Sequence, residues 1–258
     1  MTVRRTAVVT GGGNGIGAGI VRHLRAAGYE IAIVDIQDVE IEPFLSFPGE
    51  GRITTHLCDV ADGRSVATTC QAILADAPVV SVLVNNAGGS GNVRAETVED
   101  HSDEIWAHVG DLNLTSIIRF CRAFVPAMRA QRFGRIVNIS SATRHGVTHP
   151  SPTIHSRLGY VTFKAAMVGL TRQLANDLGP DQITVNTVAP GPIFADADAR
   201  IAKTMKARGE AFVTNIVNSI PLRRIGNADD IAGVVTFLAS DGAGYLSGQT
   251  IDVCGGPA

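Results

Sequence analysis

Short apolar runs rich in β-branched residues alternate along this chain with amphipathic segments of helical length, and this alternation constrains the fold more than any other feature. Most of the apolar runs lack polar interruptions, which is typical of strands buried on both faces of a parallel sheet. Helical segments near residues 15–27, 63–76, 101–131, 158–178 and 228–240 separate them. The order predicts an α/β fold, a single doubly wound parallel sheet with helices on both faces. The predicted strands are Ala7–Thr10, Ile31–Asp35, Ile53–Cys58, Val80–Asn85, Arg135–Ser140, Ile183–Val188 and Thr250–Val253.

No feature of the sequence divides the chain into separate units. It has no Pro/Ser-rich linker, no block of like charge and no internal repeat, so we expect residues 1–258 to form one domain. Two segments interrupt the regular alternation, a polar loop at Thr143–Gly159 and an extra helical stretch near residues 196–218. Each follows the carboxyl end of a predicted strand, which is the edge where open α/β sheets bind ligands.

The charge balance excludes some classes of partner. The 258 residues carry a formal net charge of −2, without the basic excess that binds nucleic acid or anionic membrane surfaces. The apolar stretch near the N-terminus is too short for the hydrophobic region of a signal peptide, and no run is long enough to span a bilayer. We therefore expect a cytoplasmic protein whose partners are small molecules, with neither nucleic acid nor membrane among them.

The residues that most often bind metals are scattered. The cysteines form no CxxC pair and have no metal-ligand spacing, and each lies in an apolar stretch, so we expect small buried side chains. Three histidines of the polar loop fit no helical pair and have no carboxylate beside them, so we expect them to face solvent. The sequence predicts no metal site. These residues are Cys58, Cys70, Cys121, Cys254, His145, His149 and His155.

A glycine-rich turn, residues 10–17, follows the first predicted strand and leads directly into a helix. Glycines let a backbone turn tightly and approach a pyrophosphate closely, and a helix N-terminus supplies N–H groups and the positive end of its dipole. A glycine-rich turn alone is weak evidence, but here it has the strand–turn–helix context that dinucleotide binding requires.

Asp35 ends the second predicted strand, about 20 residues beyond the turn, where a carboxylate can accept hydrogen bonds from the adenosine ribose hydroxyls. The alternative is an ordinary aspartate at a strand end. A 2′-phosphate would need a cation nearby, but Ile36 follows Asp35 and Asn14 occupies the turn, and a carboxylate repels a phosphate. The predicted cofactor is NAD(H) and not NADP(H).

Tyr160 and Lys164 are four residues apart and therefore share one face of a predicted helix. An ordinary tyrosine has a pKa of about 10 and is a poor base at neutral pH. A neighbouring ammonium stabilises the phenolate and lowers that pKa. A Tyr-x-x-x-Lys pair is common by chance, so its meaning depends on the motifs that accompany it.

Those motifs follow one another in a fixed order over essentially the whole chain. In that order the chain resembles the classical short-chain dehydrogenases/reductases, a family of Rossmann-fold oxidoreductases. Chance co-occurrence of the whole series is negligible. The series is Thr10-Gly11-x3-Gly15-x-Gly17, Asp59-Val60, Asn85-Asn86-Ala87-Gly88, Asn113, Ser140-Ser141, Tyr160-x3-Lys164 and Pro190-Gly191-Pro192-Ile193.

The resemblance implies a catalytic role for four residues. Tyr160 would be the general acid/base, and Lys164 would lower the pKa of its phenol and bind the nicotinamide ribose. Ser141, the second serine of its pair, would hydrogen-bond the substrate oxygen. Asn113 would hold a water that connects Lys164 to solvent.

The resemblance also implies the cofactor contacts. Asp59 and Val60 would contact adenine, residues 86–88 would line the cofactor pocket, and Ile193 would contact the nicotinamide amide, while the nicotinamide supplies the hydride chemistry. The predicted cofactor-binding residues are Gly11, Asn14, Gly15, Ile16, Gly17, Asp35, Ile36, Asp59, Val60, Asn86, Ala87, Gly88, Tyr160, Lys164, Pro190, Gly191 and Ile193.

Three positions depart from the family pattern. The interval between Ser141 and Tyr160 is longer than usual, Ala195 stands where many members have a threonine that contacts the cofactor, and Cys254 replaces the usual aspartate before two glycines. None of these changes alters the four predicted catalytic residues.

The predicted reaction is NAD(H)-dependent interconversion of a secondary alcohol and its ketone. The alternatives are a 3-oxoacyl-thioester reductase and, from another class, a catalytically inactive NAD-binding regulatory protein. The loop residues Arg144, His145, His149, His155 and Arg157 predict a substrate with a polar or anionic group, and a solvated loop that never reaches the ligand is the alternative. Apolar residues on more than one face of the helices near 101–131 and 158–178, together with the resemblance, predict a homotetramer or homodimer.

Overall fold

A computed structural model describes residues 5–77, 79–91, 93, 95–147, 157–195 and 207–256. Its strands form one parallel sheet in the order β3-β2-β1-β4-β5-β6-β7. The chain passes from β1 to one side and from β4 to the other, so the strand order reverses between these two strands. The strands are β1 Thr6–Thr10, β2 Glu30–Asp35, β3 Ile53–Leu57, β4 Val80–Asn85, β5 Gly134–Ile139, β6 Ile183–Pro190 and β7 Thr250–Val253.

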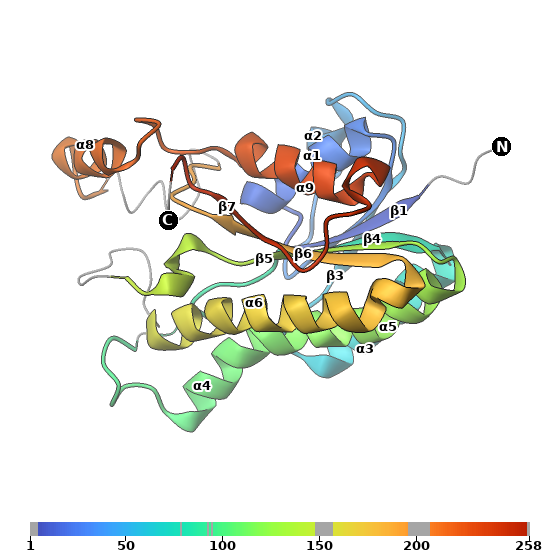
Figure 1. Cartoon of the computed structure of the whole chain (residues 1–258), viewed down its shortest axis with the longest axis horizontal. Helices are drawn as coiled ribbons and strands as arrows, with labels where there is room; N and C mark the ends of the chain where they lie inside the picture. The colour runs from blue at the N-terminus through green and yellow to red at the C-terminus, as the bar shows by residue number, and fades with distance from the viewer. Residues whose placement is uncertain are drawn as a thin grey trace.

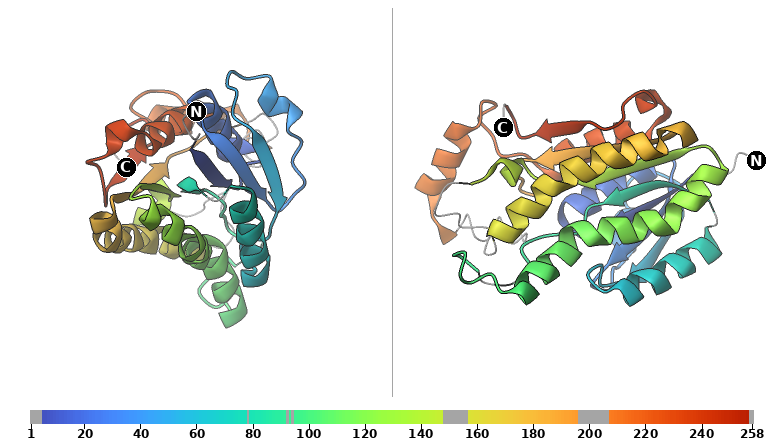
Figure 2. Two further views of the ribbon diagram at one scale, coloured as in Figure 1. Left: turned by 90° about the vertical axis from the view of Figure 1, so that its right-hand side faces the viewer. Right: turned by 60° about the horizontal axis from the view of Figure 1, so that its bottom comes forward.

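Helices cover both faces of the sheet (Figure 1). On one face α1 (Gly15–Ala26) packs against α9 (Ala228–Ala239), and on the other α3 (Gly63–Asp76), α5 (Ser116–Ala130) and α6 (Arg157–Leu178) lie side by side (Figure 2). The remaining α-helices are α2 Glu42–Leu45, α4 Asp103–Gly110 and α8 Glu210–Ser219. The predicted doubly wound sheet of a Rossmann fold is therefore confirmed.

Two apolar layers hold the helices to the sheet. Ile20 and Leu24 of α1 and Val235 of α9 are fully buried on one side, and Phe120 and Phe124 of α5 are almost fully buried on the other. Burial of such a side chain contributes about 1.5–3 kcal/mol. β1 and β4 are buried on both faces along their whole length, which explains why their sequences lack polar alternation.

The helix expected near residues 101–131 is confirmed, with one π-helical turn in its middle. α4 ends at Gly110, one π-helical turn follows at Asp111–Thr115, and α5 begins at Ser116. Asn113 in the π turn donates its side-chain N–H to the carbonyls of Val109 and Gly89. The second of these contacts joins the turn to the segment after β4, a tertiary contact that helical periodicity does not reveal.

The polar loop is shorter than expected. A 3₁₀ turn, η2, takes up Ala142–His145, and α6 begins at Arg157. Residues 148–156, with His149 and His155, lie outside the described residues. The expected helical stretch near 196–218 contains α8, which begins at Glu210, and residues 196–206 also lie outside.

The expectation for cysteine is correct for Cys58, Cys70 and Cys121, which are buried. The expectation is wrong for Cys254, which is partly exposed. Cys254 lies in the turn after β7, outside the sheet, and its Sγ lies beside the Gly256 carbonyl. Within the described ranges, no group of three or more histidines, cysteines or acidic residues could hold a metal ion. No helix within those ranges is long and apolar enough to cross a membrane.

Candidate active site

The turn after β1 has a geometry that only glycine tolerates. Gly11 and Gly15 have φ values of +62° and +59°, in the left-handed region that other residues rarely adopt. Gly17 has an ordinary φ, but a Cβ on it would lie 1.9 Å from the Gly11 carbonyl oxygen. The first turn of α1 must therefore press directly against the backbone of the turn.

The N-terminus of α1 suits an anion. Asn14 precedes the helix in an extended conformation, its side chain does not cap α1, and no acidic residue lies in the first turn of α1. The positive end of the helix dipole is therefore not neutralised by the residues of that turn, and such termini bind phosphate groups.

A hydrogen-bond network joins this turn to the segment after β4. The backbone N–H groups of Asn86 and Ala87 both donate to Thr10 Oγ1 at 3.0 Å, and Asn86 Nδ2 donates to the carbonyls of Thr10 and Gly11 at 3.0 and 2.9 Å. Residues 86–88 are thereby held beside the glycine turn, at the point where the strand order reverses.

Asp35 is buried at the end of β2. Its Oδ2 accepts the Gly13 N–H at 2.9 Å and its Oδ1 accepts the Gln37 N–H at 3.3 Å. A carboxylate has about four acceptor positions, so Asp35 retains capacity for further donors. The side chain of Ile36, in contrast, is 65% exposed.

A cavity of about 380 Å³ opens between α1 and the segment after β2. Three acidic residues, Asp35, Asp38 and Glu40, line it together with one cation, Arg22, which stacks over the Phe47 ring. Val39 packs onto the turn, since a Cβ on Gly13 would lie 2.6 Å from its Cγ2. The surroundings of Asp35 are thus predominantly acidic, and Val39 crowds the turn.

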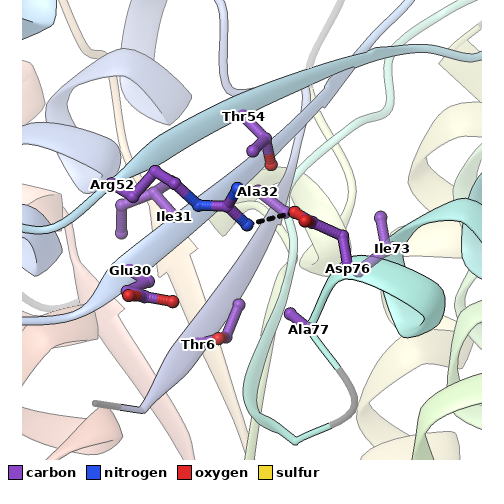
Figure 3. A pocket seen from close by; sticks show the side chains of 9 residues that line it. All are labelled: Thr6, Glu30, Ile31, Ala32, Arg52, Thr54, Ile73, Asp76 and Ala77. Atoms are coloured by element: carbon purple, nitrogen blue, oxygen red, sulfur yellow. Dashed lines mark hydrogen bonds and ion pairs between the residues drawn. The ribbon is translucent and has the colours of Figure 1, made fainter.

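A second, much smaller pocket lies at the opposite edge of the sheet, beside Thr6 and Glu30 where β1 and β2 begin (Figure 3). Its volume is about 10 Å³, room for about one water molecule. Arg52 and Asp76 form an ion pair across it. This pocket is too small for a substrate, and the candidate site is the carboxyl edge.

The residues that follow β3 lie beside the carboxyl end of β2. Asp59 is exposed and Val60 is buried after β3, and the Cys58 N–H donates to the Asp35 carbonyl at 2.7 Å. The residues expected to contact adenine therefore neighbour the residue expected to bind its ribose.

Two hydrogen bonds fix α6 to the end of β5. Lys164 Nζ donates to the Ile139 carbonyl and Ser140 Oγ donates to the Lys164 carbonyl, both at 2.7 Å. Tyr160 is one turn earlier on α6, with its ring centroid 5.7 Å from Lys164 Nζ. Ser140 thus has a structural role, which agrees with the choice of Ser141 as the residue that meets the substrate.

Lys164 is buried, with 3% of its surface exposed. Desolvation of the ammonium lowers the pKa of Lys164 from its ordinary value to about 8. A lysine with a pKa near the working pH can exchange protons as well as stabilise an anion.

Asn113, Gly88 and Lys164 meet at one point. A Cβ on Gly88 would lie 2.8 Å from Asn113 Oδ1 and 3.2 Å from Lys164 Nζ. Asn113 Oδ1 accepts the Gly89 N–H at 3.0 Å. The π turn brings Asn113 to this position, and glycine at 88 leaves room for both side chains.

Ser141 precedes η2 and accepts hydrogen bonds from the backbone N–H of Thr143 at 3.2 Å and from Thr143 Oγ1 at 2.8 Å. The next residue, Arg144, is paired with Asp252 of β7 through two contacts of 2.6 and 2.8 Å. Its guanidinium also lies 3.4 Å from the Ser141 carbonyl oxygen. The turn that carries Ser141 is therefore attached to the edge strand β7, two strands away from β5.

The segment after β6 closes the site from the other side. The Gly191 N–H donates to the Val253 carbonyl at 3.0 Å, and buried Ile193 forms a parallel bridge with Gly226. Ala195 Cβ would lie 3.8 Å from a Cβ on Gly15, so the segment that begins at Pro190 reaches the glycine turn.

The residues predicted from sequence thus lie along one edge of the sheet, whereas the loop cations have other partners. Arg144 is neutralised by Asp252, and Arg157 donates to the Glu96 carbonyl at 3.1 Å. His145 is exposed. Sequence reasoning missed Thr143 and Asp252, whose importance depends on contacts within a turn and between residues 108 positions apart.

A dinucleotide fits this arrangement. The glycine turn allows close approach of a pyrophosphate, and the N-terminus of α1 provides the anion site. Asp35, at the end of the adjacent strand β2, provides acceptors for ribose hydroxyls. The fold and the arrangement of these residues are those expected of a dinucleotide-dependent oxidoreductase.

Comparison with known proteins specifies the family. Residues 11–257 match the family model described as Enoyl-(Acyl carrier protein) reductase. The chain is 35% identical to the monensin polyketide synthase putative ketoacyl reductase of Streptomyces virginiae, covering 98% of this chain and 96% of that protein. The chain belongs to the short-chain dehydrogenase/reductase family, as the sequence motifs predicted.

Other relatives have the same overall extent. The 3-oxoacyl-[acyl-carrier-protein] reductase FabG of Haemophilus influenzae is 35% identical, with 98% of this chain and 97% of that protein covered. Among solved structures, levodione reductase has a TM-score of 0.85 at 27% identity, covering 98% and 96% of the two chains. YwfH, an NADPH-dependent reductase involved in bacilysin biosynthesis, has a TM-score of 0.87 at 25% identity, covering 98% of both chains.

Proposed function

We propose that this protein is an NAD(H)-dependent oxidoreductase that interconverts a secondary alcohol and its ketone, with Tyr160 as general acid/base. The observation that carries the proposal is the attachment of α6 to the end of β5 through Lys164 and Ser140. These contacts bring Tyr160 and Lys164 to the strand end from which Ser141 extends. A catalytically inactive NAD-binding regulatory protein would not need all of these residues.

Each residue has a defined task in the proposed mechanism. During oxidation Tyr160, as phenolate, accepts the hydroxyl proton of the substrate, and during reduction its phenol returns a proton to the same oxygen. The Lys164 ammonium stabilises the phenolate, and Ser141 donates a hydrogen bond to the substrate oxygen. After reduction Lys164 gives a proton to the Tyr160 phenolate, and it regains a proton from solvent along the path that Asn113 orders. When bound, nicotinamide supplies or takes up the hydride.

The proposed cofactor is NAD(H), although one structural neighbour is described as NADPH-dependent. Asp35 is buried with its carboxylate on the Gly13 N–H, and Asp38 and Glu40 add negative charge to the adjoining cavity. A 2′-phosphate there would meet this charge and the side chain of Val39. The other proposed contacts are those predicted for the turn, for residues 59–60 and 86–88, and for the segment 190–193.

A second candidate is reduction of a 3-oxoacyl thioester, because two relatives with nearly full coverage have names that specify ketoacyl or 3-oxoacyl reduction. The chemistry at Tyr160, Lys164 and Ser141 would be the same, and only the group attached to the reacting carbon would differ.

We also propose one domain, a cytoplasmic location and a homotetramer or homodimer. The oligomer was predicted from apolar helix residues, but most of them, including Ile117 and Met167, are already buried within one chain. The proposal of an oligomer therefore rests on the family resemblance.

The proposed function is tested by cofactor titration combined with a substrate screen. NADH should bind far more tightly than NADPH, and the double variant Asp35→Ala, Ile36→Arg should narrow or invert that preference in a fluorescence titration. NAD⁺ reduction would then be measured with cyclic alcohols, sugars, polyols and hydroxyacyl thioesters, and NADH oxidation with matching ketones. Equal wild-type affinity for the two cofactors would overturn the assignment of NAD(H), and turnover of hydroxyacyl thioesters alone would select the second candidate.

A further inference from the structure

The hydroxyl of Ser141 receives two hydrogen bonds from a single residue. The backbone N–H of Thr143 donates to Ser141 Oγ at 3.2 Å, and the Thr143 hydroxyl donates to the same oxygen at 2.8 Å. The first bond begins the 3₁₀ turn η2 and exists for any residue at 143 that has a backbone N–H. The second requires a hydroxyl at this position.

The number of donors and acceptors on a hydroxyl limits what Ser141 can then do. A serine hydroxyl has one proton to donate and two lone pairs to accept with. Both lone pairs are engaged by Thr143, so the remaining capacity of Ser141 is as a donor. A donor at this position suits a carbonyl oxygen or a developing alkoxide, because both accept hydrogen bonds.

We propose that Thr143 is a positioning residue, which donates its hydroxyl to Ser141 Oγ and so directs the single Ser141 proton towards the reacting oxygen of the substrate. The inference rests on the proposed function, because it gives Ser141 an oxygen to bind. Donation from Thr143 also polarises the Ser141 hydroxyl, and successive hydrogen bonds strengthen one another.

The surrounding contacts allow the Thr143 hydroxyl to be removed without loss of the turn. The neighbouring residue Arg144 is paired with Asp252 and lies against the Ser141 carbonyl. Thr143 itself is only partly buried. The backbone of η2 is therefore held to β7 independently of the Thr143 side chain.

The kinetic experiment compares Thr143→Val, which keeps the shape but removes the hydroxyl, with Thr143→Ser, which keeps the hydroxyl. The probe is the alcohol or ketone with the highest kcat/KM in the screen. We expect Thr143→Val to lower kcat/KM by about three- to tenfold, the effect of one neutral hydrogen bond, and Thr143→Ser to restore it. NADH affinity should be the same in both variants.

Epistasis separates positioning from a general structural effect. If Thr143 acts through Ser141, then Thr143→Val should change kcat/KM by less than about twofold in a Ser141→Ala background. The same loss in both backgrounds would overturn the proposal. An unchanged Thr143→Val enzyme would also overturn it, because the Thr143 hydroxyl would then have no effect on Ser141. A faster enzyme would overturn it too, because Ser141 would then have donated to Thr143 in the wild type.

A measurement without substrate tests the contact itself. The unfolding free energies of wild type, Thr143→Val, Ser141→Ala and the double variant should be non-additive, because the single substitutions remove the same hydrogen bond. Additive effects would overturn the inference whether or not a substrate is known. Failure of the proposed function would look different, because no alcohol or ketone would react although the two residues were coupled in stability.

Discussion

Lys164 shows how one residue serves both the fold and the proposed chemistry. Its stem is buried beneath the end of β5 and its Nζ donates to the Ile139 carbonyl. Burial stabilises the neutral amine relative to the ammonium, which lowers its pKa to about 8. A buried ammonium next to Tyr160 therefore has a desolvation cost.

This cost predicts a specific pH dependence of stability. Lys164 titrates near pH 8 in the folded chain and near 10.5 when unfolded, so the unfolded chain binds more protons between these values. Stability attributable to Lys164 is therefore greatest above the upper value and falls as the pH drops towards 8. Between these two pH values the contribution of Lys164 to the unfolding free energy changes by roughly 3 kcal/mol.

The measurement is the unfolding free energy of wild type minus that of Lys164→Met, followed between pH 7 and pH 10. We expect the difference to be constant at the lower end and to rise with pH above about 8. Subtraction of the variant removes the contribution of other titrating groups. A difference that stays flat across the whole range would show that Lys164 has an ordinary pKa.

At the scale of elements, the site depends on how closely α1 approaches the turn after β1. A Cβ on Gly17 would meet the Gly11 carbonyl oxygen at 1.9 Å, so the backbone of the turn or of α1 would have to shift. Gly17→Ala should displace the N-terminus of α1 and abolish detectable NADH binding. It should also lower stability, since overpacking costs typically 1–3 kcal/mol.

Gly233 in α9 provides the matched control for that substitution. It also lies inside a helix, but a Cβ there would meet nothing within 4 Å. Gly233→Ala should leave NADH binding unchanged and raise stability by up to about 1 kcal/mol. The account of the turn fails if the two alanine variants bind NADH equally well.

The pair between Arg144 and Asp252 attaches the catalytic turn to β7. The Arg144 side chain is 9% exposed and that of Asp252 is 31% exposed, so a substitution of Asp252 leaves a guanidinium largely buried without its partner. Asp252→Asn should lower the unfolding free energy by about 1–3 kcal/mol. It should also reduce kcat/KM, because η2 carries Ser141.

An exposed ion pair tests whether burial of the guanidinium causes the expected loss of stability. Arg129 and Asp181 lie 2.7 Å apart, with 51% and 29% of their side chains exposed. Asp181→Asn should cost less than about 1 kcal/mol, as for other surface pairs, and should leave turnover unchanged. Equal losses for the two asparagine variants would contradict the role assigned to Asp252.

Sequence reasoning predicted the strands well, because burial on both faces leaves continuous apolar runs. The expected strand Val80–Asn85 agrees with β4, and the expected strand Ile183–Val188 lies within β6, and both strands are buried throughout. Sequence reasoning did not predict a feature that depends on tertiary contacts. The π turn at Asp111–Thr115 interrupts a segment that reads as one helix, and the contact of Asn113 with Gly89 that accompanies it is tertiary.

The candidate site shows the same division. Motif order points to Tyr160, Lys164, Ser141 and Asn113, because residue type and spacing are themselves the signal, and their role as a catalytic site stays a prediction. The loop cations were assigned to substrate recognition from their charge, but Arg144 is paired with Asp252 and Arg157 with a backbone carbonyl. Charge in a sequence does not reveal whether the protein already supplies the counter-charge.

For the whole molecule, strand order explains why these distant segments meet. The order in which the chain adds strands reverses between β1 and β4, and the carboxyl ends of β1, β2, β4, β5 and β6 lie on one edge of the parallel sheet. The nucleotide turn, Asn113, Ser141 and the segment from Pro190 therefore converge although they are far apart in sequence. We therefore propose that hydride transfer takes place at this edge, with Tyr160 as the proton donor and acceptor.

The most direct test compares wild type with Tyr160→Phe on the best substrate from the screen, measuring turnover and NADH affinity on the same preparations. The account predicts a loss of turnover of about 10²–10⁴-fold or more, the usual contribution of a general acid/base, with NADH binding nearly unchanged. A Tyr160→Phe enzyme with near-normal turnover would contradict the account, because the proton would then be transferred by another group.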